Sequence, residues 1–172
     1  PFDAAAYIDA LRLDRVPSSV VVLGGGVIGV EFASVWKSFG AEVTIVEALP
    51  HLLPLEDENS SKLLERAFRR RGINFELGAR FESVKTSDDG VVGSLEGGKT
   101  IEAEYLLVAV GRGPVSAGLG YEEQGVRIER GFVIVDEYCQ TSVPTISAVG
   151  DLIPTLQLAH VGFAEGLLVA ER

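Results

Sequence analysis

Three glycines and one glutamate in the first third of the chain have the residue types and the spacing to bind an anionic ligand. Gly24, Gly26 and Gly29 form a G-x-G-x-x-G pattern directly after an apolar run. In such a pattern the first glycine allows a tight turn, the second leaves the backbone open to a pyrophosphate, and the third lets a helix lie close to the sheet. The N–H groups and the dipole at the start of that helix attract phosphates.

The elements that must position these residues are visible around them. Residues 19–23 are mostly β-branched and predict a buried strand, and an amphipathic helix follows, with an expected apolar face from Ile28 to Phe39. A second strand over residues 42–46 leads to Glu47, close to the offset of about 20 residues expected for an acid that binds ribose. An ordinary strand–turn–helix is the alternative, which this context disfavours. We assign to a dinucleotide site Gly24, Gly25, Gly26, Val27, Ile28, Gly29 and Glu47.

Glu47 also indicates which dinucleotide is bound. A carboxylate accepts hydrogen bonds from both ribose hydroxyls but repels a 2′-phosphate, which arginine usually receives. Between Ala48 and Ser61 the chain has no lysine or arginine, and His51 is the only other basic side chain there. We interpret His51 as a solvated loop residue, so the sequence predicts NAD rather than NADP.

Composition limits the partners. The chain has 172 residues, 47% of them hydrophobic and 23% charged, as in one globular domain. Its net charge of −10 argues against binding to nucleic acid or to an anionic membrane surface. Because no apolar run of spanning length and no signal peptide is seen, we expect a cytoplasmic protein. A chain that begins with Pro1 and contains no methionine suggests a piece of a longer protein. We assign no metal-binding residue.

The remaining elements follow from apolar periodicity and turn residues. Three short segments with Gly- and Asp-rich separators predict an antiparallel meander, and a nearly continuous apolar run predicts a strand covered on both faces. The expected helices cover residues 56–71 and 158–170, and the expected strands cover residues 73–76, 80–86, 91–96, 100–103, 104–110, 132–135 and 145–151. The fold class is therefore α/β: a Rossmann-like, three-layer domain with a parallel sheet, in which the meander replaces a helical crossover.

Three strings in this order carry a family resemblance. They are the glycine pattern, V-A-V-G-R-G-P from Val108 and A-V-G-D from Ala148. Together they closely resemble the pyridine nucleotide-disulfide oxidoreductases, whose FAD/NAD(P)-binding fold matches the expected one. Residues 27–36, Glu47 and the string L-A-H from Leu158 are most similar to the dihydrolipoyl dehydrogenase branch of that family.

The resemblance implies roles for further residues. Glu31 would lie near the nicotinamide carboxamide and the flavin edge, although a carboxylate early in a helix is also favoured by the dipole alone. A second glycine turn, at the nicotinamide end of the cofactor, would contain Ala109, Val110 and Gly111. Asp151 would accept a hydrogen bond from the ribityl chain of FAD, and a turn that closes a strand is the plainer alternative. Ala159 would begin a helix whose N–H groups face the flavin.

The resemblance also implies a division of the chain and a larger whole. Residues 1–17 would be a linker with a short helix, 18–144 an NAD-binding domain, and 145–172 a return segment toward an FAD-binding domain. In the complete protein, electrons would pass from dihydrolipoamide to a cysteine pair, to FAD and then to NAD⁺. That protein would be a homodimer serving a 2-oxo acid dehydrogenase complex.

This chain does not contain the groups that deliver the electrons. Cys139 is its single cysteine, and neither the His-Glu acid–base dyad nor the first FAD-binding glycine motif occurs in the sequence. We therefore assign no catalytic residue, and expect the isolated chain to bind NAD(H) weakly, hold no FAD and be inactive. The alternatives are the same domain of a mercuric reductase, a glutathione-reductase-like enzyme or a transhydrogenase, and a non-enzymatic nucleotide-binding module.

Overall fold

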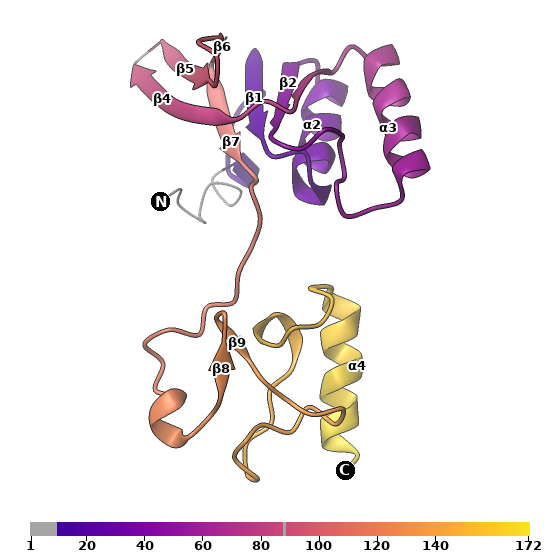
Figure 1. Ribbon diagram of the computed structural model, residues 1–172. Helices are drawn as coiled ribbons and strands as arrows, with labels where there is room; N and C mark the ends of the chain where they lie inside the picture. Colours follow the sequence, from indigo (N-terminus) through magenta and orange to yellow (C-terminus); the bar gives the residue numbers. More distant parts are fainter. Residues whose placement is uncertain (1–9, 88) are drawn as a thin grey trace. The chain divides into compact units, whose positions relative to one another are not determined.

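The computed structural model describes residues 10–87 and 89–172, and the chain divides into two compact units, one ending at Gly111 and the other beginning at Arg112 (Figure 1). This is a division by packing. The expected functional division into residues 1–17, 18–144 and 145–172 stays a prediction. Most of the first of these segments lies outside the described residues, and Ala10 and Leu11 within it are helical.

The first unit is built on a parallel sheet with the strand order β3-β2-β1-β7. All three neighbouring pairs run parallel. The strands are β1 (Ser19–Leu23), β2 (Glu42–Glu47), β3 (Asn74–Leu77) and β7 (Tyr105–Val108). Helices α2 (Val27–Ser38) and α3 (Glu58–Arg70) follow β1 and β2. An antiparallel meander of β4 (Phe81–Ser87), β5 (Gly90–Leu95) and β6 (Thr100–Ala103) leads back to β7.

Both faces of β1 are covered, which explains its continuous apolar sequence. Because side chains alternate along a strand, Val20 and Val22 pack in the cluster that contains Trp36 of α2. Val21 packs on the other face, in a cluster with Leu95 of the meander. Helices, parallel sheet and meander therefore form three layers, and the predicted fold class is confirmed (Figure 1).

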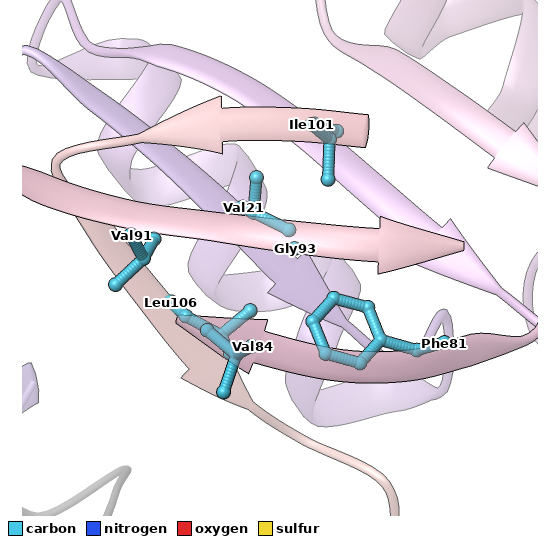
Figure 2. Close-up of a pocket in the computed structure, with 7 residues that line it drawn as sticks. All are labelled: Val21, Phe81, Val84, Val91, Gly93, Ile101 and Leu106. Atoms are coloured by element: carbon cyan, nitrogen blue, oxygen red, sulfur yellow. The ribbon is translucent and has the colours of Figure 1, made fainter. Parts of the chain in front are cut away.

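The meander packs closely on the sheet. Figure 2 shows Val21 and Leu106 of the sheet with the side chains of the meander that surround them. Gly93 of β5 lies beneath the ring of Phe81, where an added Cβ would come within 2.6 Å of a ring carbon. The position of the Phe81 ring against β5 therefore depends on a glycine at residue 93.

The buried faces of the two helices differ from the expected ones. Phe39, expected at the end of the apolar face of α2, is 66% exposed, and α2 instead buries Gly29, Val30, Ala33 and Trp36. In α3, where the apolar residues Leu63, Leu64, Ala67 and Phe68 predict a buried stripe, Phe68 is buried but Leu63 is 63% exposed. Helix α3 buries Ser61, Glu65 and Phe68, because its inner face contacts a polar backbone loop as well as apolar side chains.

A carboxylate ties the start of β1 to the start of β7. Glu104 Oε2 accepts hydrogen bonds from the backbone N–H and the hydroxyl of Ser18, at 2.8 and 2.9 Å, and Oε1 pairs with the guanidinium of Arg15. These partners, first the hydrogen bond from Arg15 and then those from Ser18, lower the pKa of Glu104 from 4.5 to about 2.

The pH dependence of this contact is a testable prediction. Because the folded-state pKa lies below the ordinary value of 4.5, Glu104 stabilises the fold fully above pH 4.5, and that stabilisation is lost as the pH falls toward 2. Glu104→Gln is expected to lower the free energy of unfolding at pH 7, and the difference from wild type should close on acidification. Urea unfolding of both proteins between pH 7 and about pH 2 measures it. A difference that does not change with pH would contradict the assigned ion pair.

The second unit contains little regular structure before its helix. It comprises η1 (Glu122–Gln124), a hairpin of β8 (Ile128–Glu129) and β9 (Phe132–Val133), η2 (Gly150–Leu152) and α4 (Ala159–Ala170). Its core includes Val126, Val133, Cys139 and Ile153. The helix expected over residues 158–170 is confirmed. None of the described helices of either unit is long and apolar enough to cross a membrane.

The prediction of a strand over residues 145–151 is wrong. Only one isolated bridge forms there, between Gln140 and Ser147, and Gly150 begins a 3-10 turn. The carbonyl of Ile146 accepts hydrogen bonds from the side chains of Gln140 and Thr141, both at 2.7 Å, and from the backbone N–H of Thr141 at 3.1 Å. Side-chain donors thus share a backbone group that in a regular strand would bond only to the neighbouring strand.

Candidate functional site

The glycine turn lies at the carboxyl edge of the parallel sheet, between the ends of β2 and β7. The N–H of Gly24 donates to the carbonyl of Val46 at 2.8 Å, and the N–H of Ala109 donates to the carbonyl of Leu23 at 2.7 Å. Gly24 has a φ of +106°, and a Cβ there would lie 2.3 Å from the oxygen of Ala109. The turn therefore requires glycine for its conformation and for its packing.

Helix α2 starts directly against this turn. A Cβ on Gly29 would lie 2.0 Å from the carbonyl oxygen of Gly24, so the helix can approach the turn only with glycine at this position. This is the packing role that the sequence pattern predicts for the third glycine.

Gly26 differs from Gly24 and Gly29, because a Cβ on Gly26 would meet no atom within 4 Å. It is the N-cap of α2, no side chain caps this end, and the first turn carries no acidic residue. The N–H groups of Val27, Ile28 and Gly29 in the first turn have no intrahelical acceptor. An open backbone surface at an uncapped helix N-terminus fits a pyrophosphate group.

Glu47 ends β2 beside the turn and is only 8% exposed. Its Oε2 accepts a hydrogen bond from the N–H of Gly25 at 2.6 Å, and its Oε1 accepts one from the N–H of Leu49 at 2.8 Å. Each carboxylate oxygen has more than one acceptor position, so this geometry leaves capacity for ribose hydroxyls. His51 is half-buried rather than solvated, with Nδ1 3.1 Å from the carbonyl of Leu52.

The second predicted turn is at the same edge of the sheet. Strand β7 ends at Val108, two residues earlier than expected, and Ala109, Val110 and Gly111 follow it. Val110 is 60% exposed, and Gly111 has a φ of +125°. The structure therefore brings both predicted turns and Glu47 to one sheet edge, and Glu31 is exposed on α2.

Asp151 and Ala159 belong to the second unit. The carboxylate of Asp151, about half exposed, lies 3.3 Å from the guanidinium of Arg112. Ala159 begins α4, whose N-cap Leu158 provides no side-chain acceptor. An exposed acceptor and an uncapped helix end are the groups that a flavin's hydroxyls and carbonyls could contact.

Sequence reasoning missed two carboxylates that bind backbone N–H groups in the loop after Glu47 and beside Asp151. Glu65 of α3 accepts a hydrogen bond from the backbone N–H of Leu52 at 3.1 Å. Glu165 of α4 accepts from the N–H of Gly150 at 2.6 Å and from the hydroxyl of Thr155 at 2.7 Å. The available signal is position, because Glu65 falls on the same helix face as the buried Ser61 and Phe68.

Known proteins are similar to this chain in sequence. The sequence matches the pyridine nucleotide-disulphide oxidoreductase family over residues 3–166. It is 40% identical to a dihydrolipoyl dehydrogenase of Bacillus subtilis over 168 residues, which cover 95% of this chain and 35% of that protein.

Solved structures agree in fold. The flavoprotein disulfide reductase RclA of Escherichia coli superimposes with a TM-score of 0.88 at 34% identity, over 94% of this chain and 37% of that one. An NAD-dependent persulfide reductase of A. fulgidus superimposes with a TM-score of 0.82 at 30% identity, over 90% and 30% of the two chains.

The chain thus spans about a third of the length of these relatives. The match nevertheless covers both predicted turns, Glu47, Asp151 and Ala159. The family uses FAD and a pyridine nucleotide. By the extent of this match, the chain belongs to the pyridine nucleotide-disulphide oxidoreductase family.

Proposed function

We propose that this chain is the NAD-binding domain of a dihydrolipoyl dehydrogenase, a flavoenzyme that oxidises dihydrolipoamide with NAD⁺ through FAD. Curated relatives of that name are 40–43% identical to it over about 95% of its length. The observation that carries the nucleotide assignment is the buried carboxylate of Glu47, held 2.6 Å from the N–H of Gly25 beside the open backbone of Gly26.

Within the first unit, each predicted residue has a role in holding the dinucleotide. The N–H groups from Gly26 to Gly29 bind the pyrophosphate, and Glu47 accepts hydrogen bonds from the adenosine ribose. The second turn, residues 109–111, contacts the nicotinamide end. Glu31 orients the carboxamide near the flavin edge.

In the second unit, Asp151 and the N-terminus of α4 at Ala159 contact FAD. When bound, FAD supplies two-electron chemistry, taking electrons from a dithiol and giving a hydride to NAD⁺. The guanidinium of Arg112, 3.3 Å away, contacts the Asp151 carboxylate and contributes to its orientation.

The described residues explain why the isolated chain should be inactive. Cys139 is buried, and this burial, followed by the charges of Glu165 and Asp136, raises the pKa of its thiol. A protonated, buried thiol is a poor nucleophile and a poor redox partner. The cysteine pair, the homodimer, the 2-oxo acid dehydrogenase complex and the cytoplasmic location are properties that we propose for the whole protein.

Titration with the two reduced cofactors tests the nucleotide assignment. NADH fluorescence should rise on addition of the 172-residue chain. NADPH should bind at least about tenfold more weakly, because the 2′-phosphate would face the Glu47 carboxylate. Equal affinity for the two cofactors would contradict the role of Glu47, and no binding of either would contradict the proposed function.

A further inference from the structure

Glu65 is a buried carboxylate for which the proposed function has no use. It lies on α3, is 8% exposed, and contacts neither predicted turn directly. Its Oε1 accepts the hydrogen bond from the N–H of Leu52, and its Oε2 lies 3.7 Å from the guanidinium of Arg69. A buried carboxylate is costly unless it is hydrogen-bonded, so its partner, the loop after Glu47, indicates what it does.

The loop held by Glu65 lies directly under the glycine turn. Leu52 is fully buried, and a Cβ on Gly25 would lie 2.7 Å from its Cδ2. The N–H of Leu53 donates to the carbonyl of Gly25 at 2.8 Å. Leu53 has a φ of +51°, a conformation that persists in a non-glycine residue only where its surroundings hold it.

Helix α3 supplies these surroundings through a second contact. The hydroxyl of Ser61, which is fully buried, lies 3.3 Å from the carbonyl oxygen of Leu53. The N–H of Leu52 is therefore satisfied by a side chain of α3, and the carbonyl of Leu53 is contacted by Ser61 in addition to the N–H of Glu56, which donates to it at 3.0 Å.

The same loop and turn hold both oxygens of Glu47. Leu49 donates to Oε1 and Gly25 donates to Oε2. A continuous series of contacts therefore runs from Glu65 through Leu52 and Gly25 to the carboxylate of Glu47. Every member of this series is buried.

We propose that Glu65 is a positioning residue for adenosine-ribose recognition: it holds the Leu52 loop, and through Gly25 it orients the carboxylate of Glu47. This inference rests on the proposed function, since it assumes that Glu47 binds the ribose. It requires an acceptor oxygen at residue 65 and no charge, because the loop partner is a neutral backbone N–H and the charged partner, Arg69, is 60% exposed and lies on the same helix.

The test compares two ligands that differ only at the ribose. NADH and its adenosine 2′-deoxy analogue are titrated into wild type, Glu65→Ala, Glu65→Gln and the control Glu58→Ala. Glu58 lies on the same helix, but it is exposed and pairs only with Lys62 among the described ion pairs. Amide hydrogen exchange at Gly25, Leu49 and Leu53 is measured on the same proteins.

Glu65→Ala is expected to weaken NADH binding by about tenfold, the effect of leaving one buried donor unsatisfied and its neighbours misplaced. Binding of the deoxy analogue should change much less, so the preference for NADH shrinks. Exchange at Gly25 and Leu53 should accelerate. Glu65→Gln should restore both readouts, and Glu58→Ala should match wild type.

Equal weakening of both ligands by Glu65→Ala would mean a general structural role and would overturn the inference, as would unchanged NADH binding. Failure of Glu65→Gln to restore the preference would also overturn it. If wild type binds NADH but shows no preference over the deoxy analogue, the ribose role of Glu47 fails and the inference with it. If wild type binds neither ligand, the proposed function itself fails.

Discussion

Gly29→Ala is expected to lower the free energy of unfolding by about 2 kcal/mol or more, although alanine is normally the better helix former. The added Cβ would lie 2.0 Å from the carbonyl oxygen of Gly24 and 3.3 Å from a methyl of Val22. These are backbone and core atoms without room to move, so α2 would have to shift away from the turn. Urea unfolding of variant and wild type measures the loss.

Two other glycines provide matched controls. Gly166 is in the interior of α4 with no atom within 4 Å of an added Cβ, so Gly166→Ala should stabilise by up to about 1 kcal/mol. Gly26 is equally open, so Gly26→Ala should cost less than about 1 kcal/mol of stability. It should nevertheless weaken NADH binding, because its methyl group would occupy the surface proposed for the pyrophosphate. A Gly29→Ala protein as stable as wild type would contradict the close contact between helix and turn.

These glycines show what local sequence pattern can predict. A β-branched run, a glycine turn and an amphipathic segment are each decided by neighbouring residues, so the parallel sheet, its first helix and the meander are where the pattern predicts them. The position of Glu47 could be predicted in the same way. It is the last residue of β2, which pairs in parallel with β1, so its side chain lies at the sheet edge where β1 leads into the glycine turn.

Features that depend on distant partners were not predictable. Residues 145–151 have strand-like composition, but they form only one isolated bridge, where the side chains of Gln140 and Thr141 share the carbonyl of Ile146 with a backbone N–H. Glu65 reads as an ordinary solvated helix residue until the loop of Leu52 is folded against it. In both cases a side chain satisfies a backbone group, and that pairing leaves no period in the sequence.

Glu47→Ala is expected to have the largest effect on cofactor choice. Removal of a buried acceptor that binds ribose hydroxyls should weaken NADH binding by about 1.5–3 kcal/mol, roughly ten- to a hundredfold. Binding of NADPH should weaken less or improve, because the charge that repels its 2′-phosphate is gone. The ratio of the two dissociation constants should therefore fall toward one, measured by fluorescence titration of both proteins.

Glu47→Gln separates recognition from support of the turn. The alanine variant also leaves the N–H groups of Gly25 and Leu49 without their acceptor, so part of its loss is structural. Glutamine keeps the size of the side chain but only one acceptor oxygen, so the N–H of either Gly25 or Leu49 loses its acceptor. The loss of stability should therefore be smaller than in the alanine variant, while the negative charge is removed completely. If electrostatic repulsion sets the choice of cofactor, the glutamine variant should lose most of the discrimination against NADPH, with a thermal stability between those of the alanine variant and wild type. Full discrimination in this variant would mean that the shape of the loop excludes the 2′-phosphate, and that the charge of Glu47 does not.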